Sequence, residues 1–195
     1  MGKIILVIGG ARSGKSEFAE NILHSCTCEG KGYIATSRIW DEEMQTRVQS
    51  HQVRRPSTWQ TWEYPQIEPE ELENIWPQAD IFLFDCVTMY VNNFLMDSYD
   101  WTKDGSDVLS HDDLEKLTQK LLQNMEKILA GVQKSEAQVV FVSNELGMGI
   151  VPDNPLSRLY RDLVGATNQK IAKAAAEVYL VVSGIPMTLR KDEPR

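Results

Sequence analysis

The sequence is poor in cysteine and lacks any long apolar run, and both absences restrict what this protein can be. Its three cysteines, Cys26, Cys28 and Cys86, match neither a C-x-x-C motif nor a zinc-binding pattern. The odd number argues against a disulfide framework, so we expect reduced thiols in a cytoplasmic protein. No apolar stretch approaches the roughly twenty residues of a membrane-spanning helix. We expect no signal peptide ahead of the fold, because the first apolar strand is reached by Lys3.

Basic residues are outnumbered by acidic ones, which limits the partners of this chain. The 20 lysines and arginines stand against 28 aspartates and glutamates, so the net charge is −8. Nucleic acids and anionic membranes repel such a surface, and we expect neither as a general partner. The chain also lacks internal repeats, low-complexity tracts and long linkers. With 195 residues, we expect a single domain that spans residues 1–195.

One stretch near the start carries the strongest signal in the chain. It fits G-x-x-x-x-G-K-[ST], the phosphate-binding loop, without a mismatch. The members of this loop are Gly9, Gly10, Ala11, Arg12, Ser13, Gly14, Lys15 and Ser16. An apolar run at 4–8 precedes the loop and a helical pattern follows it, which is the order that the motif requires. The alternative is a glycine-rich turn that binds nothing.

The residue types of this loop suit a polyphosphate. Gly9 and Gly14 can adopt positive φ, and they leave no side chain in the way of a phosphate. The loop amides and the positive end of the following helix then form an anion site. We expect Lys15 to reach the β- and γ-phosphates and the Ser16 hydroxyl to bind Mg²⁺. The sequence therefore predicts a nucleoside triphosphate site.

Apolar strands alternate with helical patterns along the whole chain. We expect strands at 4–8, 33–36, 58–63, 80–85, 138–143 and 178–183. We expect helices at 17–23, 41–55, 70–75, 88–96, 111–132 and 155–177. This alternation predicts an α/β fold of the P-loop NTPase-like class, a mostly parallel sheet with helices on both faces. The residues from Lys191 on are expected to fray.

Two further groups are expected beside the loop. The apolar strand at 80–85 ends in Asp85, the pattern of a Walker B acid, which can hold magnesium directly or through water. The alternative role for Asp85 is to cap the next helix. Thr36 and Ser37 follow another strand, and ligands of open α/β sheets bind at such strand ends. Their alternative role is only to close that strand.

The reaction that the nucleotide serves is a separate question. The N/T-K-x-D motif by which GTPases read guanine is absent, so a small-molecule kinase is the default class. His51 adds another option, because a neutral imidazole can attack an α-phosphorus, expel pyrophosphate and hold the nucleotide as a phosphoramidate. Arg54 and Arg55 could neutralise the phosphate charge meanwhile. The plainer alternative is that His51 packs on the apolar face of a helix.

A set of segments beyond the phosphate loop is distinctive. The set comprises 9–16, 33–37, 41–44 with Arg47, His51 with Arg55, Pro56 and Trp59, the stretch 144–152, and 181–184. These segments cover nearly the whole chain, and the histidine segment and 144–152 are the most specific. Together they resemble the bifunctional adenosylcobinamide kinase/adenosylcobinamide-phosphate guanylyltransferase family of cobalamin biosynthesis.

The resemblance implies two activities on one scaffold. The first phosphorylates the aminopropanol hydroxyl of adenosylcobinamide with ATP or GTP. The second transfers GMP from GTP to the new phosphate through a guanylylated histidine, giving adenosylcobinamide-GDP and pyrophosphate. The resemblance also implies His51 as that histidine, magnesium as cofactor, and a homotrimer. The implied nucleotide contacts, besides the loop, are Thr36, Ser37, Gln52, Val53, Arg54, Arg55, Glu63 and Asp85.

Two positions depart from the family pattern. Asp85 stands where many members have glutamate, and Ser50 stands where some have a second histidine, which leaves His51 as the sole candidate nucleophile.

Two rival interpretations are a kinase of another small molecule with a structural histidine, and a nucleotide-binding regulator without such chemistry. The candidate corrinoid pockets are the loop at 147–152 and an acidic excursion at 97–113.

Overall fold

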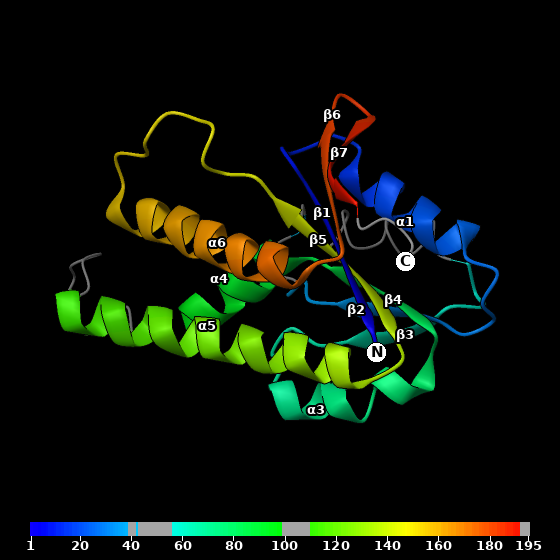
Figure 1. The fold of residues 1–195 in the computed structure, drawn as a ribbon. Helices are drawn as coiled ribbons and strands as arrows, with labels where there is room; N and C mark the ends of the chain where they lie inside the picture. The colour runs from blue at the N-terminus through cyan, green and yellow to red at the C-terminus, as the bar shows by residue number, and fades with distance from the viewer. Residues whose placement is uncertain (39–41, 43–55, 99–109, 192–195) are drawn as a thin grey trace.

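A seven-stranded sheet forms the centre of the computed structural model, which describes residues 1–38, 42, 56–98 and 110–191 (Figure 1). The strands are β1 (Lys3–Gly9), β2 (Lys31–Ala35), β3 (Gln60–Glu63), β4 (Ile81–Asp85), β5 (Gln138–Asn144), β6 (Glu177–Val182) and β7 (Ile185–Lys191). Their order across the sheet is β3-β2-β4-β5-β1-β6-β7. All neighbours pair in parallel except β6 and β7, which form an antiparallel hairpin. The predicted mostly parallel sheet is confirmed.

Helices cover both faces of this sheet, as predicted (Figure 1). On one face lies α1 (Lys15–Ser25). On the other face lie α4 (Val87–Ser98), α5 (His111–Lys134) and α6 (Pro155–Ala174), with the short α3 (Pro69–Glu73) and η1 (Trp76–Gln78) beside them. Because the interior strands are covered on both faces, they read as continuous apolar runs rather than as alternating ones.

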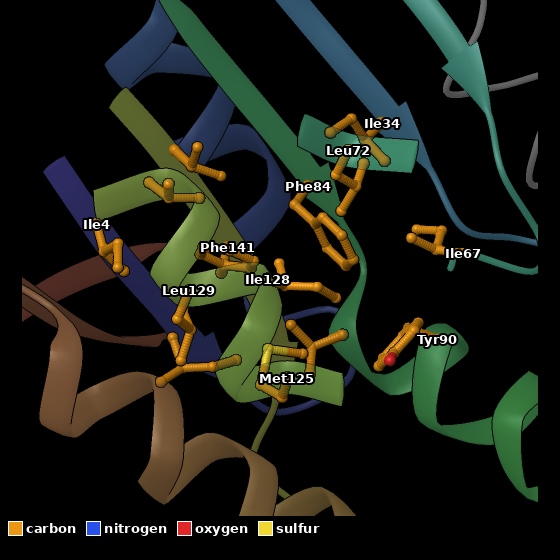
Figure 2. Packing of buried hydrophobic residues seen from close by; sticks show 14 of the residues in the cluster. Ile4, Ile34, Ile67, Leu72, Phe84, Tyr90, Met125, Ile128, Leu129 and Phe141 are labelled. Atoms are coloured by element: carbon orange, nitrogen blue, oxygen red, sulfur yellow. The ribbon is translucent and has the colours of Figure 1, made fainter. Parts of the chain in front are cut away.

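The larger core fills the space between the sheet and the helices α4, α5 and α6 (Figure 2). Phe84 and Phe141 of neighbouring strands lie with their ring centroids 5.1 Å apart. Met125 and Ile128 of α5 belong to the same cluster, and all four side chains are at most 1% exposed. Burial of each such side chain contributes roughly 1.5–3 kcal/mol. This packing holds the strands whose carboxyl ends carry the candidate site.

Side-chain caps set where the two long helices begin. The hydroxyl of Ser110 accepts a hydrogen bond from the backbone N–H of Asp113 at 3.2 Å, which confirms the predicted cap of α5. Asn154 caps α6 in the same way, and Pro155 occupies the first helical position.

The antiparallel strand β7 was not predicted. The expected last strand ended at Ser183, whereas the structure turns at Ser183 and Gly184, both at positive φ, and returns along β6. All residues of β7 are exposed, so no buried apolar run marks this strand. Pro186 is tolerated because β7 is an edge strand.

The cysteines require a correction. Cys26 and Cys28 form a disulfide, with their Cα atoms 5.3 Å apart, and Cys86 is free. The prediction of three reduced thiols is therefore wrong for Cys26 and Cys28, because an odd count argues against a framework of bridges but leaves one local bridge open. Among the residues described here, no helix has the length and apolar character needed to cross a membrane.

Candidate active site

The phosphate loop has the strand–loop–helix context that its sequence predicts, but of its two glycines considered for positive φ only Gly14 adopts it. It connects the end of β1 to the start of α1, with Gly14 as the residue before the helix. Gly14 has φ 91°, in the left-handed region where a side chain is strained. Its carbonyl oxygen accepts from the N–H of Phe18 at 3.0 Å, which starts the helix ladder. The strand–loop–helix context of the motif is confirmed.

The turn between β6 and β7 supports this loop from outside. The N–H of Gly184 donates to the carbonyl oxygen of Ser13 at 2.7 Å. A Cβ atom on Gly14 would lie 3.0 Å from the Gly184 Cα, and one on Gly9 would lie 2.5 Å from the Val181 carbonyl oxygen. Both glycines are therefore required by close backbone approach.

Lys15 occupies a partly buried position inside the loop. Its Nζ donates to the carbonyl oxygen of Gly10 at 3.1 Å. Burial lowers the pKa of the Lys15 ammonium, although the nearby Cys86 thiol and Asp85 carboxyl act in the opposite direction. A desolvated ammonium bonded to a neutral carbonyl gains from exchanging that partner for a phosphate, because charge-assisted hydrogen bonds are stronger.

Asp85 ends β4 on the same sheet face as Lys15, and a tyrosine from the neighbouring strand holds its carboxylate. The hydroxyl of Tyr33, a residue only 2% exposed, donates to Asp85 Oδ2 at 2.6 Å. The two strands pair in parallel with Ala35 opposite Asp85, so Tyr33 reaches across from two positions earlier in β2. The bond fixes the orientation of the carboxylate.

The oxygen donors at this edge suit magnesium. Mg²⁺ takes one or two protein oxygens and fills its octahedron with phosphate oxygens and water. Asp85 supplies a carboxylate and Ser16 a hydroxyl at the start of α1. Within the described part of the chain no cluster of three or more histidine, cysteine, aspartate or glutamate side chains could hold a metal alone. This donor set fits a metal that binds together with a nucleotide.

Thr36 joins the ends of β2 and β4. Its hydroxyl donates to the Cys86 carbonyl oxygen and accepts from the Cys86 N–H, both at 2.8 Å, and its own N–H donates to the Asp85 carbonyl oxygen. Thr36 is fully buried, and its carbonyl oxygen accepts from Asn93 at 2.8 Å. Burial raises the pKa of the Cys86 thiol to about 11, so it stays protonated. Thr36 thus positions the backbone on which Asp85 sits.

The other expected contacts on these strands lie at the same edge. Ser37 is half-buried just after β2, and Glu63 is exposed at the end of β3, where it is in register with Ala35. Arg38 follows Ser37 and donates to both carboxylate oxygens of Asp97 in α4, at 2.8 and 2.7 Å. The parallel register therefore brings together the described candidate residues from four separate segments of the chain.

Five candidate residues are not placed by the structure. His51, Gln52, Val53, Arg54 and Arg55 lie outside the described residues, and so does most of the helix expected at 41–55.

Comparison with known proteins identifies the chain. Residues 5–189 match the family model described as cobinamide kinase/cobinamide phosphate guanyltransferase. The chain belongs to this family. A bifunctional adenosylcobalamin biosynthesis protein of Escherichia coli is 41% identical over 96% of this chain and 99% of its own length. Its counterpart in Salmonella typhimurium is 39% identical over 96% and 99%. A protein of the same description in Pseudomonas aeruginosa is 35% identical over 97% and 98%.

Membership of this family confirms the predicted resemblance and the transferase class. A solved KaiC-like protein of Pyrococcus horikoshii is also similar in fold, with a TM-score of 0.46 at 10% identity, covering 92% of this chain and 70% of its own.

Two features of this family member's site were missing from the sequence prediction. The first is Tyr33, whose signal is a hydroxyl-bearing residue in a buried strand near its carboxyl end. The second is the turn at Ser183 and Gly184, whose S-G dipeptide is a turn signal that stands in the printed sequence. Neither signal predicts the contact partner, which is Asp85 for Tyr33 and Ser13 for Gly184.

Proposed function

We propose that this enzyme phosphorylates adenosylcobinamide and then transfers GMP from GTP to the product, using one phosphate loop for both reactions. The observation that carries the proposal is the partly buried Lys15 in a formed loop, beside a carboxylate held on the same face of the sheet. The substrates of the proposal follow from the description of the family, cobinamide kinase/cobinamide phosphate guanyltransferase.

In the kinase step, the aminopropanol hydroxyl oxygen attacks the γ-phosphorus. A new O–P bond forms, the bond between the γ-phosphorus and the β–γ bridging oxygen breaks, and the nucleoside diphosphate leaves while the hydroxyl proton passes to solvent or a base. Lys15 and the loop amides hold the β- and γ-phosphates in line. Ser16 and Asp85 would hold a magnesium ion, which would supply positive charge against the phosphates. ATP or GTP can serve as donor.

In the guanylyl step, a ring nitrogen of His51 attacks the α-phosphorus of GTP and pyrophosphate leaves. An oxygen of adenosylcobinamide phosphate then attacks the same phosphorus, the P–N bond breaks, and His51 is free again. The proposed nucleotide contacts besides the loop are Thr36, Ser37, Gln52, Val53, Arg54, Arg55, Glu63 and Asp85. Thr36 also positions the backbone on which Asp85 sits. The covalent route spares the pocket from holding two polyanions at once.

Labelling with GTP that carries the label on its α-phosphate tests this proposal. We expect acid-labile, alkali-stable label on the denatured wild-type protein and none on His51→Ala, while His51→Ala keeps the kinase activity. Absence of label in the wild type, with kinase activity present, would favour a plain kinase. Nucleotide binding without turnover of adenosylcobinamide would favour a regulator. Equal loss of both activities in His51→Ala would refute the division of labour.

We also propose that the enzyme works in the cytoplasm as a homo-oligomer, a trimer by family resemblance. Exposed apolar side chains support an association surface: Ile185, Met187 and Leu189 of β7 are between 52% and 67% exposed. Exposed apolar side chains on an edge strand favour pairing with another chain. Light scattering of the purified protein tests this part, and a monomer at micromolar concentration would contradict it.

A further inference from the structure

Asn144 ends the strand that separates the phosphate loop from the Asp85 strand. β5 lies between β1 and β4, with Gly9 opposite Asn144 on one side and Asp85 opposite Val142 on the other. Asn144 is therefore level with the first residue of the loop and extends just beyond the level of the carboxylate. It begins the distinctive stretch 144–152, and no individual role in the site is predicted for it from the sequence.

The side chain of Asn144 belongs to the face on which the nucleotide phosphates are expected. Side chains alternate along a strand, and Val140 and Val142 pack in the cluster beneath α1. Asn144 continues that row past its apolar end, toward the N-terminus of α1. Lys15 and Asp85 lie at the same end of this face.

The backbone of Asn144 is fixed from two sides. Its carbonyl oxygen accepts a hydrogen bond at 3.0 Å from the side-chain Nδ2 of Asn168, a residue of α6 that is only 7% exposed. The next N–H, of Glu145, donates to the Gly9 carbonyl oxygen at 3.1 Å. These two bonds couple the position of Asn144 directly to the start of the loop.

The carboxamide of Asn144 has unused hydrogen-bonding capacity. Its Oδ1 atom is buried and has no hydrogen-bond partner among the residues that the structure describes, and the same holds for Ser13 Oγ inside the loop. An unsatisfied buried polar atom is costly, so both atoms are suited to a ligand. A carboxamide carries two N–H donors and an acceptor, and a half-turn of its end exchanges them. It can therefore present an N–H to a phosphate oxygen.

We propose that Asn144 donates a hydrogen bond to the terminal phosphate of the bound nucleoside triphosphate, and that Asn168 is the positioning residue that holds it there. The inference rests on the proposed nucleotide site. With a nucleotide bound, the loop amides would surround the β-phosphate, and the γ-phosphate would lie toward the edge between the loop and Asp85. In the kinase step Asn144 orients the γ-phosphoryl group, and in the guanylyl step it binds the departing pyrophosphate.

Calorimetric titration with GTP and GDP, at one magnesium concentration, tests the contact. We expect Asn144→Ala to weaken GTP binding roughly tenfold and GDP binding less than twofold. The reason is that the variant loses a hydrogen bond to a charged oxygen of the terminal phosphate, and GDP lacks that phosphate. Asn144→Asp has nearly the same shape but repels phosphate, so we expect a larger loss for GTP. Asn21→Ala removes an exposed carboxamide from α1 and serves as the matched control, with both affinities unchanged.

The ratio of the two affinities separates contact from folding. A variant that only disturbs the fold loses GTP and GDP binding together and has a lower unfolding temperature; that outcome in both Asn144 variants would overturn the proposal, as would unchanged GTP binding. Failure of the wild type to bind GTP would refute the proposed function itself. If GTP labels the wild type and the Asn144 variants bind GTP as tightly as the wild type does, this inference alone would be refuted.

Discussion

At the amino edge of the sheet, a lysine, a carboxylate and a tyrosine form a closed cluster. Lys3 Nζ donates to Glu177 Oε1 at 2.5 Å, and the Tyr179 hydroxyl donates to Glu177 Oε2. At the carboxyl edge, on the same face, Lys15, Asp85 and Tyr33 repeat these residue types. There the tyrosine again donates to the carboxylate, but the lysine donates to a loop carbonyl oxygen instead.

The difference between the two clusters lies in what each leaves for a ligand. In the amino-edge cluster the lysine charge is already neutralised by its carboxylate. In the carboxyl-edge cluster, Lys15 is near Asp85 yet bonded to a neutral acceptor, and burial lowers its pKa. Breaking the hydrogen bond between Lys15 and a carbonyl oxygen costs less free energy than breaking an ion pair. A phosphate can therefore replace that carbonyl oxygen as the acceptor. Identical residue types thus give a structural cluster at one edge and a candidate binding site at the other.

Loss of the lysine should have the most unequal effect on the two edges. We expect Lys15→Ala to lower both transfer activities by at least about a hundredfold, since a donor to developing phosphate charge is removed. Lys3→Ala should leave both activities within about twofold and lower the free energy of unfolding by about 1 kcal/mol, a modest loss because the pair is partly exposed. Coupled kinase and pyrophosphate-release assays measure the first effect, and urea denaturation the second. Activity retained in Lys15→Ala would refute the assignment.

The two tyrosines allow a finer comparison. Tyr33→Phe removes the bond that orients Asp85, so we expect magnesium binding to the nucleotide complex to weaken roughly tenfold, as for other groups that orient a metal ligand. Tyr179→Phe removes the equivalent bond to Glu177 and should leave magnesium binding unchanged. Electron paramagnetic resonance of Mn²⁺ titrated into the GTP complex measures this directly, apart from turnover. Equal behaviour of the two variants would mean that Tyr33 has no positioning role.

The sequence predicted the parts of the site that are encoded locally. The loop needs glycines, a lysine and a hydroxyl within eight residues, and Asp85 follows an apolar run. Both can therefore be recognised from the sequence alone. The alternation of strands and helices could be predicted as well, because each element is encoded by a local pattern of apolar residues. The parallel register then brings the separate strand ends to one edge.

Partners across the sheet were not predictable in the same way. Tyr33 and Asp85 are 52 positions apart, and only the pairing of β2 with β4 brings them together. The strand β7 was not predicted because all of its residues are exposed, and its sequence therefore lacks the continuous apolar run of a buried strand. The alternation of Ile185, Met187 and Leu189 after a turn dipeptide was the available signal.

The smallest expected effect concerns the acid dependence of the amino-edge cluster. Burial acts to raise the pKa of Glu177, but the hydrogen bonds from Lys3 and Tyr179 outweigh it, and the pKa is lowered from its ordinary 4.5. A depressed carboxyl pKa stabilises the fold above the unfolded-state value, and this contribution is lost as the pH falls through the folded-state value.

Replacement of Glu177 by glutamine should remove that pH-dependent contribution. We expect wild type to exceed Glu177→Gln by about 1 kcal/mol in free energy of unfolding at pH 7, with the gap closing as the pH falls from about 5 to 3. Urea denaturation across this range measures the gap, and Glu136→Gln, at an exposed glutamate before β5, is the control. A gap that stays constant down to pH 3 would mean that the charge of Glu177 contributes nothing. The amino-edge cluster would then be held by packing and by hydrogen bonds that do not depend on charge, and its contrast with the candidate phosphate-binding edge would rest on Lys15.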